Sequence, residues 1–357
     1  MANDIRISII NPLTNPLWDN YVSAQKESSL YHYSYWINVI SETYLYKPMC
    51  IIAENSRKKI LGGIVLSIIS NKLTKKKIVS MPLSDYCNIL SDKKDVISRL
   101  IEYVLDYADR NRFTFVEIRT RNQSLIRGIP AFKESPIIFK NHILPLESPL
   151  EQIYMNFHKN YIKRNIVKAE KSSLVIRQIS GEEDMKVFYR LHVMTRKKHG
   201  LPPQPFLFFR NIRSNLLVEN CFSGLIAFDE GRPAAAIILA EYKDTLYYLY
   251  GGSDPHLLTK RPNHLLLWTA IKTAHYKGLK KFDFGRTSPE NKGLLDFKRR
   301  WGTEENDIIH YQYTKNPKKQ SLITRKIRTN QFTFKILRRL PAFVLRAFGF
   351  IIYRYIK

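Results

Sequence analysis

The sequence has few of the features that mark several common kinds of site and compartment. Its three cysteines, Cys50, Cys87 and Cys221, lie far apart and in no metal-binding spacing, which favours a reduced, cytoplasmic protein. No zinc motif, no Walker loop and no recognisable Ser-His-Asp order is present. The N-terminus lacks a basic segment followed by a long apolar run, so no signal peptide is expected.

Acidic residues are also scarce relative to basic ones. The 357 residues contain 58 Lys and Arg against 31 Asp and Glu, a net charge of +27. Such an excess predicts attraction to phosphates, to an anionic membrane face or to nucleic acid, without choosing among them. With 44% apolar and 25% charged residues, the chain is expected to be globular, and it is long enough for two domains.

Long apolar runs are missing as well, even near the C-terminus. Thr314–Arg328 is polar and basic, which is typical of a linker. In Phe332–Lys357 the longest charge-free run, Ala347–Tyr353, has seven residues, whereas a membrane-spanning helix needs about 20. Basic and apolar residues interleave there, as in segments that lie in a membrane interface, and Pro341 should divide the segment into two helices. The alternative is a helix packed on the protein's own core.

One stretch, residues 245–302, predicts a compact supersecondary unit. Thr245–Tyr250 is β-branched and aromatic and predicts a buried strand. Asn263–Lys277 predicts a helix with Asn263 as its N-cap, and Gly278 stands where a left-handed C-terminal residue belongs. Lys281–Phe284 predicts a second strand, so the two strands should be parallel with a crossover helix.

The same order of elements is expected in both halves of the chain. The residue pattern of each half predicts a hairpin, then a strand, a helix and a second strand. This repeated order indicates a structural duplication. In the first half these are Met49–Ala53 with Ile60–Ile69, Ile78–Met81, Asp95–Arg110 and Phe113–Thr120. In the second they are Cys221–Phe228 with Pro233–Ala240, followed by the three elements of the unit just described.

Four motifs in the second half resemble the Fem-type peptidoglycan bridge aminoacyltransferases and related acyltransferases of exopolysaccharide systems. They are YLYGG, PNHLLLW, FDFGRTSP and GLLDFKRRWG, and the resemblance extends from about Tyr154 to Gln312. It implies an α/β (α+β) fold with tandem GNAT-like domains, each a mixed sheet flanked by helices, plus a C-terminal amphipathic helical tail. The expected domains are 1–153, 154–313 and 314–357.

The resemblance implies transfer of an acyl or aminoacyl group to an amine. In the Fem family a Phe-Lys pair lies beside the acceptor and the donor ester, and it matches Phe297-Lys298 here. Lys298 would stabilise the negative charge of the tetrahedral oxyanion, unless it is simply a surface lysine. Asp283 would orient or deprotonate the amine, or else pair with Arg286. The expected substrate-binding residues are Arg286, Tyr248, Tyr250 and Arg196, the last of which also suits the dipole at its helix end.

The donor is expected to be acyl-CoA or aminoacyl-tRNA, with no tightly bound cofactor and no metal. The loop His256–Asn263 lacks the glycines usual in CoA-binding GNAT enzymes, but its positive residues precede a helix N-terminus. The donor's phosphate is therefore expected at Lys260, Arg261, Asn263 and His264, although His264 also suits a structural role.

The expected acceptor is a phosphate-bearing envelope precursor, either nucleotide- or lipid-linked, at the inner face of the cell membrane. Its anionic lipid surface and tRNA are the other expected partners. The alternative is a non-enzymatic, degenerate GNAT pair that binds such precursors or nucleic acid at the membrane.

Overall fold

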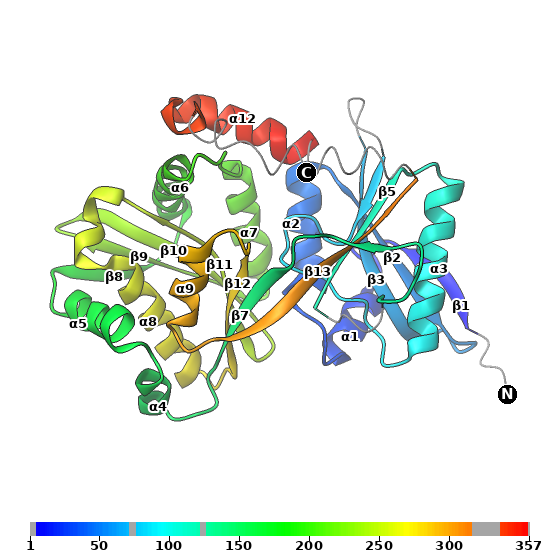
Figure 1. Cartoon of the computed structure of the whole chain (residues 1–357), viewed down its shortest axis with the longest axis horizontal. Coiled ribbons are helices and arrows are strands. Elements are labelled where there is room, and N and C mark those ends of the chain that lie inside the picture. The colour runs from blue at the N-terminus through cyan, green and yellow to red at the C-terminus, as the bar shows by residue number, and fades with distance from the viewer. Residues whose placement is uncertain (1–4, 71–75, 122–125, 316–335, 356–357) are drawn as a thin grey trace. The chain divides into compact units, whose positions relative to one another are not determined.

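The computed structural model describes residues 5–70, 76–121, 126–315 and 336–355 (Figure 1). The chain forms two compact units, each built from separated segments. The first unit contains Met1–Phe139, Asp307–Thr329 and Tyr353–Lys357, and the second contains Lys140–Asn306 and Asn330–Ile352. The division thus falls at Phe139 and Asn306, where the sequence suggested boundaries at 153 and 313.

The first unit is a mixed sheet with strand order β1-β2-β3-β4-β5-β13. Neighbouring strands pair antiparallel except β4 and β5, which are parallel and are joined by the crossover helix α3. The strands are β1 (Arg6–Ile10), β2 (Lys47–Glu54), β3 (Ile60–Ile69), β4 (Lys77–Val79), β5 (Phe115–Thr120) and β13 (Glu304–Thr314), and β6 (Lys133–Glu134) also pairs with β13. The main helices are α1 (Pro16–Ala24), α2 (Ser34–Tyr44) and α3 (Lys94–Arg110).

The core of this unit forms because α3 carries its apolar residues at helical spacing. Val96, Leu100 and Val104 are fully buried and belong to one cluster with Ile51 of β2 and Leu66 of β3. The helix that the sequence predicted at Asp95–Arg110 is thus confirmed.

On the side of β5 that faces β4, the end of β5 is paired with a loop rather than with a strand. Beyond the end of β4, Ser80 N donates to Glu117 O at 2.8 Å, and Arg119 N donates to Ser80 Oγ at 2.8 Å. Cys87 N then donates to Arg119 O at 2.9 Å. The chain's own residues 80–87 therefore occupy the position beside β5 that β4 has left.

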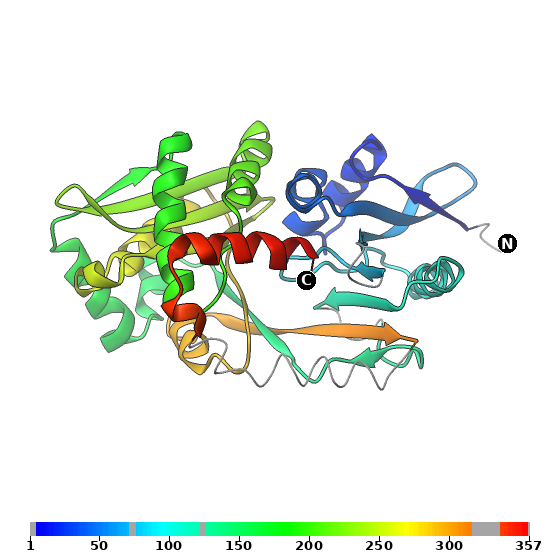
Figure 2. The same cartoon turned by 90° about the horizontal axis from the view of Figure 1, so that it is seen from above.

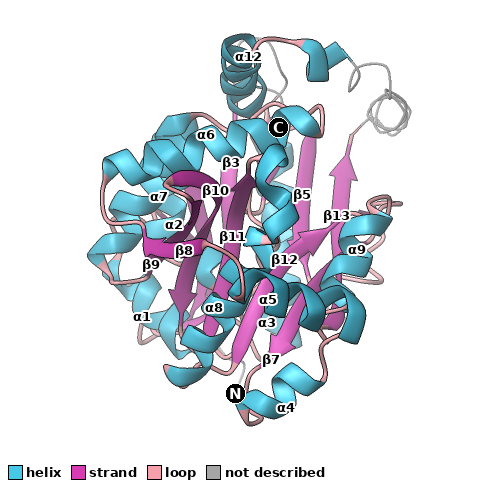
Figure 3. Cartoon of the chain, turned by 90° about the vertical axis from the view of Figure 1, so that its left-hand side faces the viewer, coloured by secondary structure: helices cyan, strands magenta, loops and turns pink. Residues whose placement is uncertain are grey.

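The second unit is a mixed sheet with strand order β7-β12-β11-β10-β9-β8, in which β11 and β12 are parallel. Helices α5 and α8 lie on one face of this sheet and α6 and α7 on the other (Figures 1 and 3). The strands are β7 (Phe139–Pro145), β8 (Leu174–Gln178), β9 (Phe222–Asp229), β10 (Arg232–Tyr242), β11 (Thr245–Ser253) and β12 (Lys281–Thr287). The helices are α4 (Leu150–Met155), α5 (Arg164–Glu170), α6 (Glu182–Lys198), α7 (Phe206–Val218), α8 (Pro262–Tyr276), α9 (Lys292–Arg299) and α12 (Ala342–Tyr355).

The predicted duplication is confirmed by the order of elements. The first unit has the hairpin β2-β3, strand β4, helix α3 and strand β5, and the second has the hairpin β9-β10, strand β11, helix α8 and strand β12. In each unit the last two strands are the parallel pair. The predicted α/β class with tandem mixed sheets is therefore confirmed.

The predicted N-cap of α8, Asn263, was wrong by two residues. The helix begins at Pro262, its N-cap is Arg261 with φ of 62°, and Asn263 lies inside the first turn without capping it. Proline has a fixed φ suited to the first helical position, so it sets the start ahead of the asparagine. The prediction for the other end is confirmed, because Gly278 has φ of 77° and Leu279 N donates to Ala274 O at 3.0 Å.

Two further local patterns in the sequence predict contacts that the structure does not have. The sequence Ser180-Gly-Glu-Glu183 is typical of a capping box, but Gly181 is the N-cap of α6, and Ser180 bonds through both N and Oγ to Asp184 Oδ2 at 2.9 Å. The helical spacing of Tyr161 with Ile162 and Ile166 predicts an inward tyrosine before α5. Tyr161 is instead 50% exposed, with the Arg300 guanidinium 3.7 Å from its ring centroid.

The C-terminal segment contains the predicted break at Pro341. Residues 336–339 are helical, Leu340 and Pro341 are not, and α12 follows. The predicted linker from 316 onward, together with residues 332–335 and 356–357 of the tail, lies outside the described residues. Helix α12 lies against α6, where the Arg346 guanidinium stands over the Tyr189 ring (Figure 2). Among the described residues, no helix has the length and hydropathy needed to cross a membrane.

Candidate functional site

The parallel strands β11 and β12 pair only over their first residues. Their register joins Thr245 to Lys281, Leu246 to Phe282 and Tyr247 to Asp283, and it ends there. On its other side β11 stays paired with β10, with an irregularity that leaves Leu249 out of the ladder. The carboxyl ends of the two strands therefore diverge, and ligands bind at such ends in open α/β sheets.

Asp283 lies at the last paired position of β12 and is 2% exposed. Its Oδ1 accepts hydrogen bonds from Asn141 Nδ2 of β7 and from Gly285 N, both at 2.7 Å. Gly285 has φ of 74°, a left-handed conformation that glycine adopts without strain, and the β12–β7 register shifts there. The carboxylate thus holds an irregular strand end in place.

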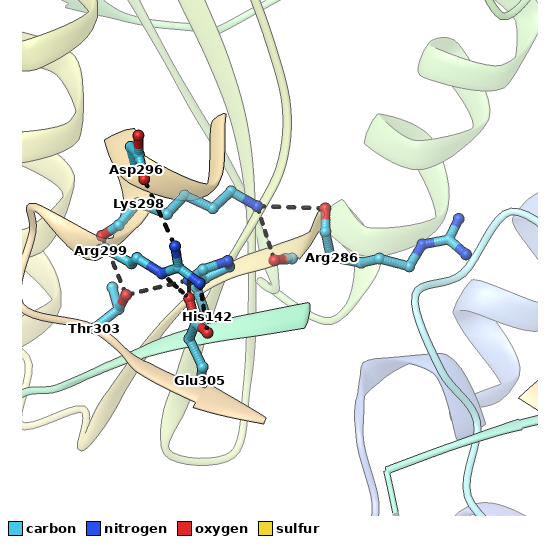
Figure 4. A network of polar contacts seen from close by, with 8 residues as sticks. His142, Arg286, Asp296, Lys298, Arg299, Thr303 and Glu305 are labelled. Carbon is cyan, nitrogen blue, oxygen red and sulfur yellow. Dashed lines mark hydrogen bonds and ion pairs between the residues drawn. The ribbon is translucent and has the colours of Figure 1, made fainter. Parts of the chain in front are cut away.

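Lys298 is the other charged group buried at this strand end. It comes from α9, whose first turn is capped by Asn291 accepting from Leu294 N at 3.2 Å. The side chain is 3% exposed, and Nζ donates to Gly285 O at 2.8 Å and to Arg286 O at 3.4 Å (Figure 4). The alternative that Lys298 is a surface lysine is therefore wrong, while its expected role at the oxyanion stays a prediction.

The amphipathic character of α9 explains why a lysine enters the interior. Leu295 and Lys298 are three residues apart and are the buried residues of the helix. Phe297 packs beside them, with its ring centroid 5.6 Å from that of His264 and 6.1 Å from that of Trp301. The Phe-Lys pair is therefore fixed by core packing on one side and by strand carbonyls on the other.

A polar network lies behind Lys298 (Figure 4). His142 Nδ1 lies 3.3 Å from Thr303 Oγ1, and that hydroxyl donates to Lys298 O at 3.1 Å. Burial, with the Lys298 charge as the next cause, lowers the pKa of His142 to about 4, so the ring is neutral at pH 7. Glu305, 3.7 Å from this ring, has its charged partner in Arg299, whose Nε lies 2.6 Å from Oε1.

His142 Nε2 is buried and has no hydrogen-bond partner among the described residues. The same holds for Thr287 Oγ1 at the end of β12 and for Trp301 Nε1, just after α9. Buried polar atoms without partners are uncommon in native structures and call for an explanation such as a ligand or an ordered water. Here they come from the elements that surround Lys298.

The residues expected to bind donor phosphate lie at the start of α8 but differ in their contacts. Lys260 Nζ is paired with Asp229 Oδ1 at 2.6 Å and bonds to Ser173 Oγ at 2.8 Å. The exposed Arg261 side chain makes no hydrogen bond or ion pair with any described residue. The part of the expected phosphate site that is open to a ligand is therefore Arg261.

His264, one turn into α8, faces the Phe297 side of the site. Its Nε2 lies 3.4 Å from Asn165 Nδ2, and its ring stacks on Trp301 with centroids 6.0 Å apart. Burial first, and then the Arg261 charge, lowers the pKa of His264 to about 4. The structure thus brings His264 next to Phe297, while Asn263 is half-buried in the same turn.

The four expected substrate-binding residues do not lie together. Tyr248 packs against the core cluster on the α8 side, where burial raises its pKa to about 12. Tyr250 lies instead against the aromatic residues of α6 and α7, with its ring centroid 5.2 Å from that of Phe209. Arg196 donates from Nε and Nη2 to Pro202 O, and the Arg286 side chain leads away from the Lys298 ammonium (Figure 4).

Sequence reasoning missed Asn141, His142 and Thr303. The first two lie on β7, which the sequence did not predict as a strand, and they reach the site through pairing with β12. Thr303 directly follows the motif GLLDFKRRWG. Its position as a polar residue after Trp301-Gly302 was the one feature of the local sequence that could have marked it as part of the site. In the described part of the chain, no group of three His, Cys, Asp or Glu residues is placed to hold a metal ion.

These features define the class of protein. Residues 156–299, which lie in the second unit, match the family described as Acetyltransferase (GNAT) domain. Over 102 residues the chain is 35% identical to the Lipid II:glycine glycyltransferase of Staphylococcus aureus (strain USA300). That match covers 26% of this chain and 24% of the relative, so it spans about a quarter of the relative's length.

Solved structures show the same fold over most of the chain. A crystal structure of FemX superposes with a TM-score of 0.71 at 16% identity, covering 89% of this chain and 99% of that one. A tandem GNAT protein from the clavulanic acid biosynthesis pathway gives 0.56 at 10% identity, covering 88% and 99%. The resemblance to Fem-type proteins and the tandem GNAT architecture predicted from the sequence are thereby confirmed.

Proposed function

We propose that this chain is an N-acyltransferase that transfers an acyl or aminoacyl group to an amine of a peptidoglycan or polysaccharide precursor, at the inner face of the cell membrane. The observation that carries the proposal is the buried Lys298 ammonium at the diverging end of β12. A buried ammonium is costly to desolvate, so its presence inside a GNAT domain favours a role in charge stabilisation. The Fem-type relatives support the acceptor class.

The proposed reaction has the acceptor amine attack the carbonyl carbon of the donor. A C–N bond forms, and the C–O bond of an aminoacyl ester or the C–S bond of a thioester breaks. The amine loses a proton to a base, and the leaving alcohol or thiol takes one up. Lys298 would stabilise the oxyanion between these events, and Phe297 would line the reacting groups. Asp283 would orient the amine through the strand end that it holds.

The donor is either an acyl-CoA or an aminoacyl-tRNA, and both carry phosphate. Arg261 is exposed before the first turn of α8, which supports a contact between its guanidinium and that phosphate at the helix N-terminus. The absence of glycine from 256–263 favours aminoacyl-tRNA, as does the net charge of +27. A GNAT domain of ordinary type favours acyl-CoA.

A panel of donors and acceptors tests the proposal. Acetyl-CoA and glycyl-, alanyl- and seryl-tRNA would each be incubated with a nucleotide-linked and a lipid-linked peptidoglycan precursor, and the acceptor mass measured. A gain of one acyl or aminoacyl group, absent without protein, is expected for one donor class. Tight binding of a precursor with no mass change across the whole panel would instead identify a non-enzymatic binding protein.

A further inference from the structure

Helix α12 has two different apolar faces. On the inner face Leu345 is fully buried, and Gly349 lies so close to Pro203 that a side chain at 349 would overlap the Pro203 carbonyl. The outer face consists of exposed large apolar residues at helical spacing. Their exposed fractions are 73% for Phe343, 40% for Phe350 and 50% for Ile351, with Phe348 at 40% on the flank.

These two faces answer a question that the sequence left open. The tail was expected either to lie on a membrane or to pack on the protein's own core. The inner face packs, so the helix has a fixed orientation on the second unit, and the outer face is left to solvent by that same packing. Scattered exposed apolar residues are normal, but three phenylalanines and an isoleucine on one helix form a patch of the kind found at interaction sites.

In the sequence that contains this patch, every charged side chain is basic. Residues 308–357 contain twelve Lys and Arg residues and no Asp or Glu. Arg338, Arg339 and Arg346 are exposed on or just before α12. The basic end of α6 lies nearby. Burial first, and then the charges of Lys198, Arg196 and Arg338, lower the pKa of His199, so Arg338 lies within electrostatic range of that helix end. An apolar face bordered by basic side chains matches an anionic lipid surface.

We propose that the outer face of α12 docks the second unit on an anionic lipid bilayer. Phe343, Phe350 and Ile351 enter the boundary between headgroups and acyl chains, while the arginines reach the headgroup phosphates. The docking deepens the proposed function, since it would hold the enzyme beside a lipid-linked acceptor. The binding itself needs no catalysis and can be measured without it.

The test compares vesicles of phosphatidylglycerol mixed with phosphatidylcholine against vesicles of phosphatidylcholine alone. The variant Phe343→Ser/Phe350→Ser/Ile351→Ser should bind the anionic vesicles about tenfold more weakly or worse, because it loses the apolar contribution to interfacial binding. A matched control, Val218→Ser/Tyr276→Ser, changes exposed apolar residues elsewhere in the same unit, at 68% and 75% exposure. It should bind as the unchanged protein does.

A second measurement keeps the proposal testable if the triple variant misfolds. The four native tryptophans are buried, so Phe343→Trp adds one exposed fluorophore. Its emission should shift to shorter wavelength with the anionic vesicles and stay unchanged with phosphatidylcholine alone. An emission that does not shift overturns the proposal, as does equal binding of the triple variant and the unchanged protein to anionic vesicles.

The remaining outcomes distinguish membrane docking from dimerisation through the same face and from the proposed acyltransferase function. If sedimentation equilibrium shows a dimer that the triple variant abolishes, and no vesicle binding occurs, the outer face takes a second copy of the chain and the membrane proposal is wrong. Acyl transfer without vesicle binding refutes the docking alone. Vesicle binding without acyl transfer leaves the docking intact and refutes the proposed function.

Discussion

The substitution Lys298→Met removes the buried ammonium and nearly preserves the volume of the side chain. It deletes the hydrogen bonds from Nζ to Gly285 O at 2.8 Å and to Arg286 O at 3.4 Å. Each bond from a charged donor contributes about 1.5–3 kcal/mol, but burying an ammonium costs several kcal/mol. Since these two terms oppose each other, the free energy of unfolding should change by no more than about 2 kcal/mol.

The effect on catalysis should be much larger than the effect on stability. Loss of one group that stabilises an oxyanion lowers turnover by about 100- to 1,000-fold, or roughly 2.7–4 kcal/mol. Because the oxyanion exists only in the transition state, kcat and kcat/KM should fall by the same factor. Initial rates with the donor and acceptor that the panel described above selects, at several concentrations of each, would measure both constants.

A matched control comes from the same helix. Lys292 is exposed at the first position of α9, so Lys292→Met removes an equal charge without touching the strand end, and its kcat should equal that of the unchanged protein. Thermal unfolding of both variants would show that they fold. If Lys298→Met folds and keeps its full kcat, the lysine has no part in the chemistry and the reasoning from its burial is wrong.

Three further predictions concern the surroundings of Lys298. Arg261→Ala should raise KM for the phosphate-bearing donor and weaken the salt dependence of donor binding. Lys260→Ala should act mainly on stability, because Lys260 is already paired with Asp229. Equal donor-binding isotherms for Arg261→Ala and the unchanged protein would contradict the first expectation. Asp283→Ala should lower the free energy of unfolding by about 2–4 kcal/mol in denaturant titrations, since Asn141 Nδ2 and Gly285 N lose their acceptor. The pKa of His142 is lowered from 6.5 to about 4, so the unfolded chain binds more protons between these values and stability should fall as the pH falls through them. Urea midpoints measured across that pH range should fall less steeply with falling pH for His142→Gln than for the unchanged protein.

Much of the fold could be predicted because its central elements carry strong local patterns. The strands and crossover helix of the second unit have apolar residues at the right period and a glycine at the helix end. Strands β7 and β13 were missed because polar residues interrupt them, as Asn141 and His142 do in β7 and His310 does in β13. Those residues are buried through pairing with distant strands, which no local period records.

The candidate site divides in the same way. Phe297, Lys298 and Asp283 could be named because they belong to two motifs, GLLDFKRRWG and FDFGRTSP, that lie within one stretch of sequence. Asn141 could not, because its bond to Asp283 joins residues 142 positions apart. The N-cap of α8 was misplaced by a local rule, since the preference for asparagine is weaker than the fixed φ of the neighbouring proline.

The position of β13 in the first unit affects how the protein folds during synthesis. Ile309 and Tyr311 of this strand are buried in the first unit's core, and β13 pairs with β5 from Ile309 to Thr314. The ribosome makes β5 long before β13, so the edge of β5 stays open while the intervening residues emerge. Strands β8 to β12 lie in one continuous segment and meet no such delay. The sheet whose synthesis starts first is therefore completed last, and its open strand edge can pair with other chains until β13 has emerged.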